Sequence, residues 1–439
     1  MCAVVTFTQN IKLKGSGIYA KKEAGTMGFV ETLKSEFSFV KGNYAVMVIS
    51  WILVDFAAEL PATYFSLYVL GLGATETILG VIGLSQFLAL ASLQFPGGYL
   101  ADKYGRKWLI STMTFGVTFS FILYAIAPSW PVILVGVILM SIFNSTYQPA
   151  LNAMISDSLP PEKRGMGFSI VMLIASVSTT PSPAVAGLLR ANFDLIPGMR
   201  IAYGIVVGLF LIAALIRSFF LKETVVSSSK PRLKEIFQSY PTALKESFRV
   251  WRKVPKSMFY LFLAFSVAIF GFSATFLYTV VYATRVLLID EVVWAFVTAL
   301  VPLTTIILAI PVGKLVDKVK RKIPILASIL IFGLSMWVFV HGDLAKVALS
   351  LILMGIGQVM LNASFSALQT DLTPKEQRGK VSGFINFANY IVMASGSLLG
   401  GYLYEHVAPQ APFMLAIITV LPSSLLTLML VKEPEKREK

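Results

Sequence analysis

Long apolar runs alternate with short polar segments along almost the whole chain. Each run has about the length that a helix needs to cross a bilayer core of about 30 Å, at a rise of about 1.5 Å per residue. Strands of a membrane barrel would instead be alternating segments of about ten residues. The pattern therefore predicts an all-α polytopic membrane protein with twelve transmembrane helices, at about 44–69, 77–100, 108–127, 131–155, 167–189, 200–221, 258–283, 292–315, 323–341, 345–368, 381–403 and 411–431.

The composition supports this prediction and narrows the function. Hydrophobic residues make up 56% of the 439 positions and charged residues only 14%, too few to cover a soluble protein of this size. The single cysteine, Cys2, cannot form an internal disulfide. The sequence has no spacing typical of metal ligands and no nucleotide-binding loop, which disfavours an ATP-driven pump. We expect no cofactor.

Basic residues are unevenly distributed, and their positions assign an orientation. If the N-terminus is cytoplasmic, almost all of the 37 Lys and Arg residues fall in cytoplasmic segments. Such residues stay on the cytoplasmic side during insertion, so we expect both termini inside and a plasma-membrane location. The net charge of +14 then reflects topology, and we expect no nucleic-acid partner.

Two motifs occur twice, about 215 residues apart. "GYLADKYGRK" (98–107) matches "GKLVDKVKRK" (313–322), and "DSLPPEKRG" (157–165) matches "DLTPKEQRG" (371–379). The repeat indicates a six-plus-six duplication, a layout typical of transporters that bind substrate between two halves. It predicts five segments: a cytoplasmic N-terminal segment 1–43, a first half 44–221, a linker 222–257, a second half 258–431 and a tail 432–439.

These motifs give the chain a resemblance to the major facilitator superfamily over residues 44–431. The family signature G-x-x-x-D-[RK]-x-G-R-[RK] is matched by Gly98, Asp102, Lys103, Gly105, Arg106 and Lys107. The second copy has Lys320 in place of the inner glycine, and the P-x-x-x-R-G element follows spans four and ten. The resemblance implies a transporter, not an enzyme, that works by alternating access.

The motif loops are candidates for a cytoplasmic gate. Glycines there permit a tight turn, and Asp102 can pair with Arg106 and cap the positive N-terminus of a neighbouring helix. In the family that neighbour is span eleven, which begins here just after Arg378. The alternative is that the charges only anchor the loops. The gate candidates are Gly98, Asp102, Gly105, Arg106, Lys107, Asp317, Arg321, Arg164 and Arg378.

Two acids lie deep in the first apolar run. Asp55 and Glu59 are four residues apart, so they share one helix face. Carboxylates inside a membrane are costly and are functional by default. We expect the pair to couple transport to protons or to contact a cationic substrate. The alternative is a structural acid that bonds to polar groups of spans four or five.

Polar residues in spans four and ten occupy matching positions and could line a central cavity. Hydrogen bonding between helices explains them equally well, and aromatic residues of spans one and seven can also face lipid. The cavity-lining candidates are Tyr64, Asn144, Gln148, Asn152, Gln358, Asn362 and Tyr278.

Spans five and eleven stand where the family carries its antiporter motif, G-x-x-x-G-P-x-x-G-G. Pro183 and Gly187 match in the first, and Gly396, Gly400 and Gly401 match in the second, where Ser397 replaces proline. Small residues allow close helix crossing. The partial match favours the drug/proton antiporter branch, although span four lacks the family's arginine.

The sequence therefore predicts a monomeric secondary active transporter in a lipid bilayer. Its expected partners are protons and a small-molecule substrate, and proton-coupled efflux of small amphipathic compounds is favoured. Proton-coupled uptake of a sugar, organic acid or other metabolite is the first alternative. A membrane receptor or sensor that does not transport is the second.

Overall fold

The computed structural model describes residues 39–94, 96–160, 163–225, 245, 249, 251, 254–374 and 377–434. Residues 41–439 belong to one compact unit, whereas only 39 and 40 are described of the preceding unit, 1–40. Most of the predicted N-terminal segment and linker, and the end of the tail, lie outside the described residues. The domain boundaries therefore stay predictions.

The described part of the unit is helical throughout. Its first half contains α2 (Gly42–Ala62), α3 (Phe65–Gly71), α4 (Glu76–Leu93), α5 (Pro96–Tyr104), α6 (Arg106–Ile126), α7 (Trp130–Asp157), α8 (Arg164–Thr179), α9 (Ser182–Asn192) and α10 (Leu195–Phe220). Its second half contains α12 (Lys256–Phe276), α13 (Thr279–Arg285), α14 (Glu291–Thr298), α15 (Leu300–Lys318), α16 (Lys322–Val340), α17 (Leu344–Leu372), α18 (Arg378–His406) and α19 (Ala411–Leu430).

Eleven helical stretches in the described part are long and apolar enough to cross a membrane. The remaining predicted span corresponds to α18, which has 29 residues but carries serine, glycine and asparagine among its apolar residues. Each of the twelve predicted spans thus has a helical counterpart, and the prediction of an all-α membrane protein with two six-helix halves is confirmed.

Five predicted spans are interrupted, which the hydrophobic pattern did not reveal. The breaks lie between α2 and α3, α4 and α5, α8 and α9, α12 and α13, and α14 and α15. Proline explains three of them, since Pro96, Pro181 and Pro302 lack the N–H that would continue the helical hydrogen bonds. Interrupted helices are common where transporters form a site.

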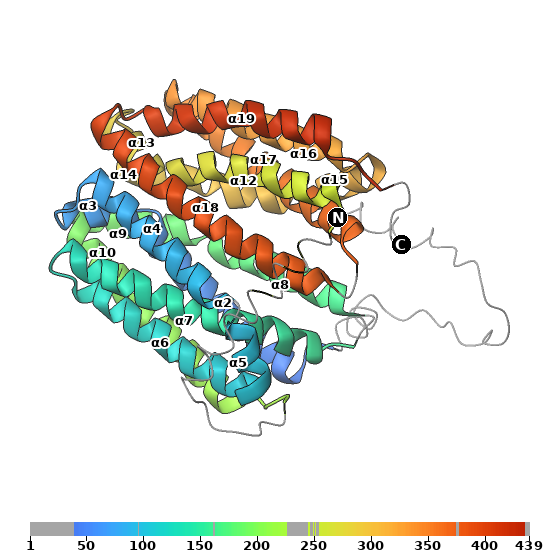
Figure 1. The fold of residues 1–439 in the computed structure, drawn as a ribbon. Coiled ribbons are helices and arrows are strands. Elements are labelled where there is room, and N and C mark those ends of the chain that lie inside the picture. The colour runs from blue at the N-terminus through green and yellow to red at the C-terminus, as the bar shows by residue number, and fades with distance from the viewer. Residues whose placement is uncertain are drawn as a thin grey trace, which may run out of the picture. The chain divides into compact units, whose positions relative to one another are not determined.

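Helices of the two halves pack together mainly through two pairs, and α8 with α15 and α3 with α13 add smaller contacts. Helix α4 packs along α18, and α9 packs against α14; Figure 1 shows α4 beside α18. The bundle has two ends, and each carries its own group of polar contacts. We call the end that carries the repeated motifs (residues 98–107, 157–165, 313–322 and 371–379) the motif side, and the opposite end, with Glu76 and Glu291, the far side.

Candidate functional site

A cavity of about 720 Å³ lies between the two halves. Its wall comes mainly from α2, α6, α7 and α10 on one side and from α12, α14, α15 and α17 on the other, with smaller contributions from α3, α4, α9 and α13. Aromatic residues from both halves supply much of its apolar surface, among them Phe121, Tyr124, Phe272, Phe276 and Trp294. A volume of this size accommodates a small organic molecule.

Both predicted acids lie on the wall of this cavity, projected from the same face of α2. Glu59 is exposed and lines the cavity. Asp55 is half-buried, and its Oδ2 atom is shielded from solvent without a hydrogen-bond partner. A shielded carboxylate oxygen without a donor is costly while it is charged. The position suits a carboxyl group that takes up and releases a proton or a cation.

The structure separates the other predicted lining residues into two groups. Asn144, Gln148 and Gln358 line the cavity, whereas Asn152 and Asn362 are not part of its wall. Tyr64 and Tyr278 also lie away from it, because both are held by contacts at the far side. Their hydroxyl groups donate across the boundary between the halves, so they connect the halves instead of lining the cavity.

A buried arginine in the cavity wall was given no role by the sequence pattern. Arg217 on α10 is only 1% exposed. Its Nε donates to Ser50 Oγ at 3.0 Å, and its Nη1 donates to Thr114 Oγ1 at 2.9 Å. The ring centroid of Tyr147 lies 5.7 Å from the guanidinium carbon. A charge inside an apolar span is the signal that could have singled out this residue.

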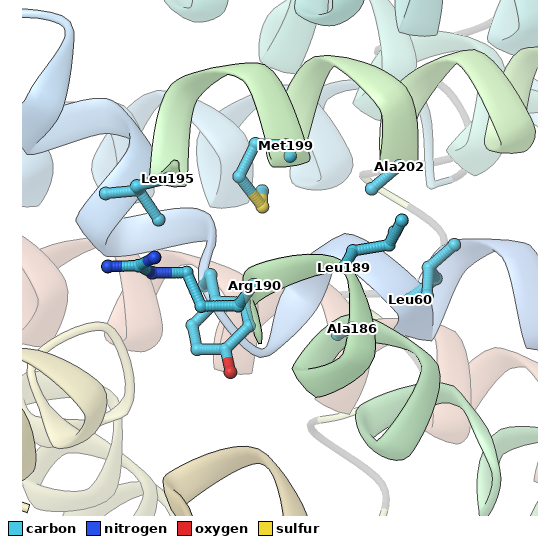
Figure 2. A pocket seen from close by; sticks show the side chains of 9 residues that line it. Leu60, Ala186, Leu189, Arg190, Leu195, Met199 and Ala202 are labelled. Atoms are coloured by element: carbon cyan, nitrogen blue, oxygen red, sulfur yellow. The ribbon is translucent and has the colours of Figure 1, made fainter. Parts of the chain in front are cut away.

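One group of contacts closes the far side through Glu291, at the start of α14. Arg190 donates to the Glu291 carboxylate at 2.5 Å, and the Tyr64 hydroxyl donates to the Glu291 carbonyl at 2.6 Å. Arg190 and Tyr64 also line a small void of about 10 Å³ between α2, α9 and α10, room for roughly one water. Figure 2 shows Arg190 beside this void, below Leu195.

A second group of contacts surrounds Glu76, at the start of α4. Arg285 donates to its carboxylate at 3.1 Å, and the Tyr278 hydroxyl donates to its carbonyl at 3.1 Å. The next residue, Thr77, donates its N–H to Glu405 at 2.7 Å. Every hydrogen bond and ion pair between the halves whose two partners are both described joins their far-side portions.

On the motif side, the two repeated motifs contact each other within each half. Arg106 Nη1 forms an ion pair with Asp157, at the end of α7. In the second half, Arg321 Nε lies 3.7 Å from Asp371, near the end of α17. The equivalent residues of the repeat thus make equivalent contacts, which explains why both motifs occur twice.

The remaining gate candidates are described in part. Gly105 precedes α6 with φ +97°, a conformation that favours glycine. Arg378 donates to the carbonyls of Thr373 at 3.3 Å and Thr370 at 3.1 Å, so it joins α18 to the end of α17. The side chains of Asp102, Arg164 and Asp317, and the surroundings of Gly98, lie outside the described residues. The proposed contact of Asp102 with span eleven stays a prediction.

Two further acids, Glu223 and Glu433, cap helices on the motif side, a role that the sequence pattern did not indicate. Glu223 accepts from the N–H groups of Arg106 at 2.9 Å and Lys107 at 3.0 Å, so it caps α6. Glu433 caps α16 in the same way, through the N–H of Lys322 at 2.8 Å. The signal was a third short repeat, "LKE" at 221–223 and "VKE" at 431–433. A carboxylate at a helix N-terminus is favourable.

Replacing Glu223 with alanine is expected to destabilise the first half by about 1 kcal/mol, because two helical N–H groups lose their acceptor. Thermal unfolding of the purified protein measures the change. Lys222→Ala is the matched control, since Asn43 holds Lys222 only through its backbone N–H and carbonyl. Equal melting temperatures for Glu223→Ala and the control would show that the cap contributes nothing.

Repeat-related helical halves around a charged cavity are typical of membrane transporters. The model of the Major Facilitator Superfamily matches residues 44–290 and 287–439, and the chain belongs to this family. It is therefore a membrane transporter of small molecules and not an enzyme.

Several known proteins resemble the chain over most of its length. A multi-drug resistance efflux pump PmrA homolog of Lactococcus lactis is 25% identical over 84% of this chain and 90% of its own. The multidrug resistance protein MdtH of Proteus mirabilis is 23% identical over 76% and 80%. Among solved structures, the nucleoside transporter NupG has a TM-score of 0.72 at 14% identity, covering 88% of this chain and 99% of that one.

Proposed function

We propose that the protein is a proton-coupled efflux transporter of small amphipathic compounds that works by alternating access. The observation that carries the proposal is the position of Asp55 and Glu59 on the wall of a cavity between the two halves. A carboxyl group there can meet water from one side at a time, so its proton and the substrate can be exchanged across the membrane.

Three further observations support efflux and an amphipathic substrate. Relatives that match most of the chain are named as multidrug efflux or resistance proteins. The partial antiporter motif lies where the halves meet, since an ideal Cβ on Gly187 would contact Ala295 at 3.0 Å. Aromatic residues in the cavity wall provide flat apolar surface for a ring-containing substrate.

The test is transport in proteoliposomes under an imposed pH gradient. The substrate panel holds lipophilic cationic dyes, neutral amphipathic compounds, sugars and small organic acids. We expect the amphipathic compounds to move against the direction of proton flow, and proton flux to follow substrate addition. Movement of sugars or organic acids together with protons would replace this proposal with the uptake alternative.

We also propose that the motif side is cytoplasmic, in the plasma membrane, which follows from the distribution of basic residues. In a Cys2→Ser background, Ser229→Cys in the predicted linker should react with a membrane-impermeant maleimide only after the cells are opened. The matched far-side variant is Leu288→Cys, at a position that is 80% exposed. It should react in intact cells, and the reverse pattern would invert the proposed orientation.

A further inference from the structure

We propose that Arg217 binds an anionic group of the transported compound. This inference deepens the proposed function and rests on it, because it concerns the same cavity. Its substrate is an amphipathic molecule with a carboxylate or a similar anion, and its site is the part of the wall where Arg217 on α10 contacts side chains of α2, α6 and α7.

The guanidinium is held in a fixed position by neutral groups. Its Nε and Nη1 donate to Ser50 Oγ and Thr114 Oγ1. Both hydroxyls use their own hydrogen to bond backbone carbonyls, Ser50 to Met47 and Thr114 to Ile110, so each presents an oxygen lone pair to the arginine. Tyr147 packs on the guanidinium and lines the cavity beside it. The arginine is therefore oriented in advance.

The charge of this arginine is not neutralised by a neighbour in contact. None of the ion pairs within the described part of the chain includes Arg217. Its Nη2 forms none of the hydrogen bonds made by the described residues. A buried charge normally has a partner, and a guanidinium is charged at every physiological pH. Asp55 on the same wall interacts with Arg217 electrostatically but forms no ion pair with it in contact, so an anion that enters the cavity can supply a partner in contact.

The Nη2 edge of the guanidinium, which makes no hydrogen bond within the described residues, suits a carboxylate. Its N–H groups form a planar fork that can donate two parallel bonds to carboxylate oxygens, and one edge of that fork is still available. The cavity also holds Asp55, whose Oδ2 has no hydrogen-bond donor. A compound with an anion and an amine meets both charges: its anion binds Arg217, and its amine can take the place of a proton at Asp55.

Two matched probes test the proposal on the purified full chain at about pH 6. They are naphthylalanine and its amide, which lacks only the anionic charge. Calorimetric titration should show naphthylalanine binding about tenfold more tightly than its amide, as expected for a charged hydrogen bond. Equal or weaker binding of naphthylalanine overturns the proposal without any variant.

Variants then test whether Arg217 causes the preference for naphthylalanine over its amide. Arg217→Gln should remove the tenfold difference and leave the affinity for the amide within about twofold. Arg217→Lys should retain part of it, because the charge remains but the planar fork is lost. Arg200→Gln, on the same helix and outside the cavity wall, is the matched control and should keep the full difference. A tenfold preference that persists in Arg217→Gln contradicts the assignment.

The experiments distinguish a failure of the anion site at Arg217 from a failure of the proposed proton coupling. Asp55→Asn should keep the preference for naphthylalanine over its amide, whereas it should lose coupling to protons in the transport assay. A missing carboxylate preference with normal proton coupling refutes only the role of Arg217. A carboxylate preference without proton coupling refutes only the proposed coupling. If the Arg217→Gln protein does not fold, the comparison of the two probes on the wild type and the Arg217→Lys variant decide whether Arg217 binds the anion.

Discussion

Asp55→Asn is expected to abolish accumulation of substrate against its gradient while exchange down the gradient continues. Asparagine keeps the size of the side chain and most of its hydrogen-bonding capacity, but it cannot gain or lose a proton. A difference of one pH unit supports an accumulation of about tenfold for one proton per substrate. We expect this ratio to fall to about one.

Glu59→Gln should be measured in parallel, because both acids line the same cavity. Proton flux and substrate flux are recorded together in proteoliposomes, so that slow transport is distinguished from uncoupled transport. Asp343→Asn is the matched control, since Asp343 is exposed at the start of α17 and lies outside the cavity wall. Normal proton-to-substrate stoichiometry in both cavity variants would exclude this pair as the coupling site.

Gly401→Val is expected to reduce turnover at least tenfold by keeping the far side open. An ideal Cβ at Gly401 would lie 2.6 Å from the carbonyl oxygen of Glu76 and 2.7 Å from the Tyr278 hydroxyl. The first is a backbone atom of the other half, so a side chain fits only if α18 and α4 move apart. The state with a closed far side then becomes unfavourable, and the transport cycle is blocked.

A cysteine at Thr63, which lines the cavity, reports the state of the far side. Its reaction with an impermeant reagent from that side should be faster in Gly401→Val than in the parent. Gly208→Val is the matched control, because an ideal Cβ at Gly208 has no atom within 4 Å. Parental turnover together with unchanged labelling in Gly401→Val would mean that this close approach does not govern closure.

The sequence located the acids and the repeated motifs, but it did not show which motif contacts which. Asp157 and Arg106 are 51 residues apart, and only the packing of α6 against α7 brings them together. Tyr64 and Tyr278 were predicted to line the cavity but contact the other half instead, for a related reason. A tyrosine on an apolar helix suits a cavity wall and a contact between halves equally well, and the two differ only in what faces the helix.

The sequence by itself determined that this chain crosses the membrane twelve times in two related halves, and that span one carries the acids. Backbone groups in a bilayer must be satisfied within each helix, so length and hydrophobicity alone identify a span. Only the tertiary structure showed which side chains hold Arg217 and which residues contact Glu76 and Glu291 on the far side. Those contacts join residues more than 100 positions apart, and local pattern carries no information about which helix faces will meet.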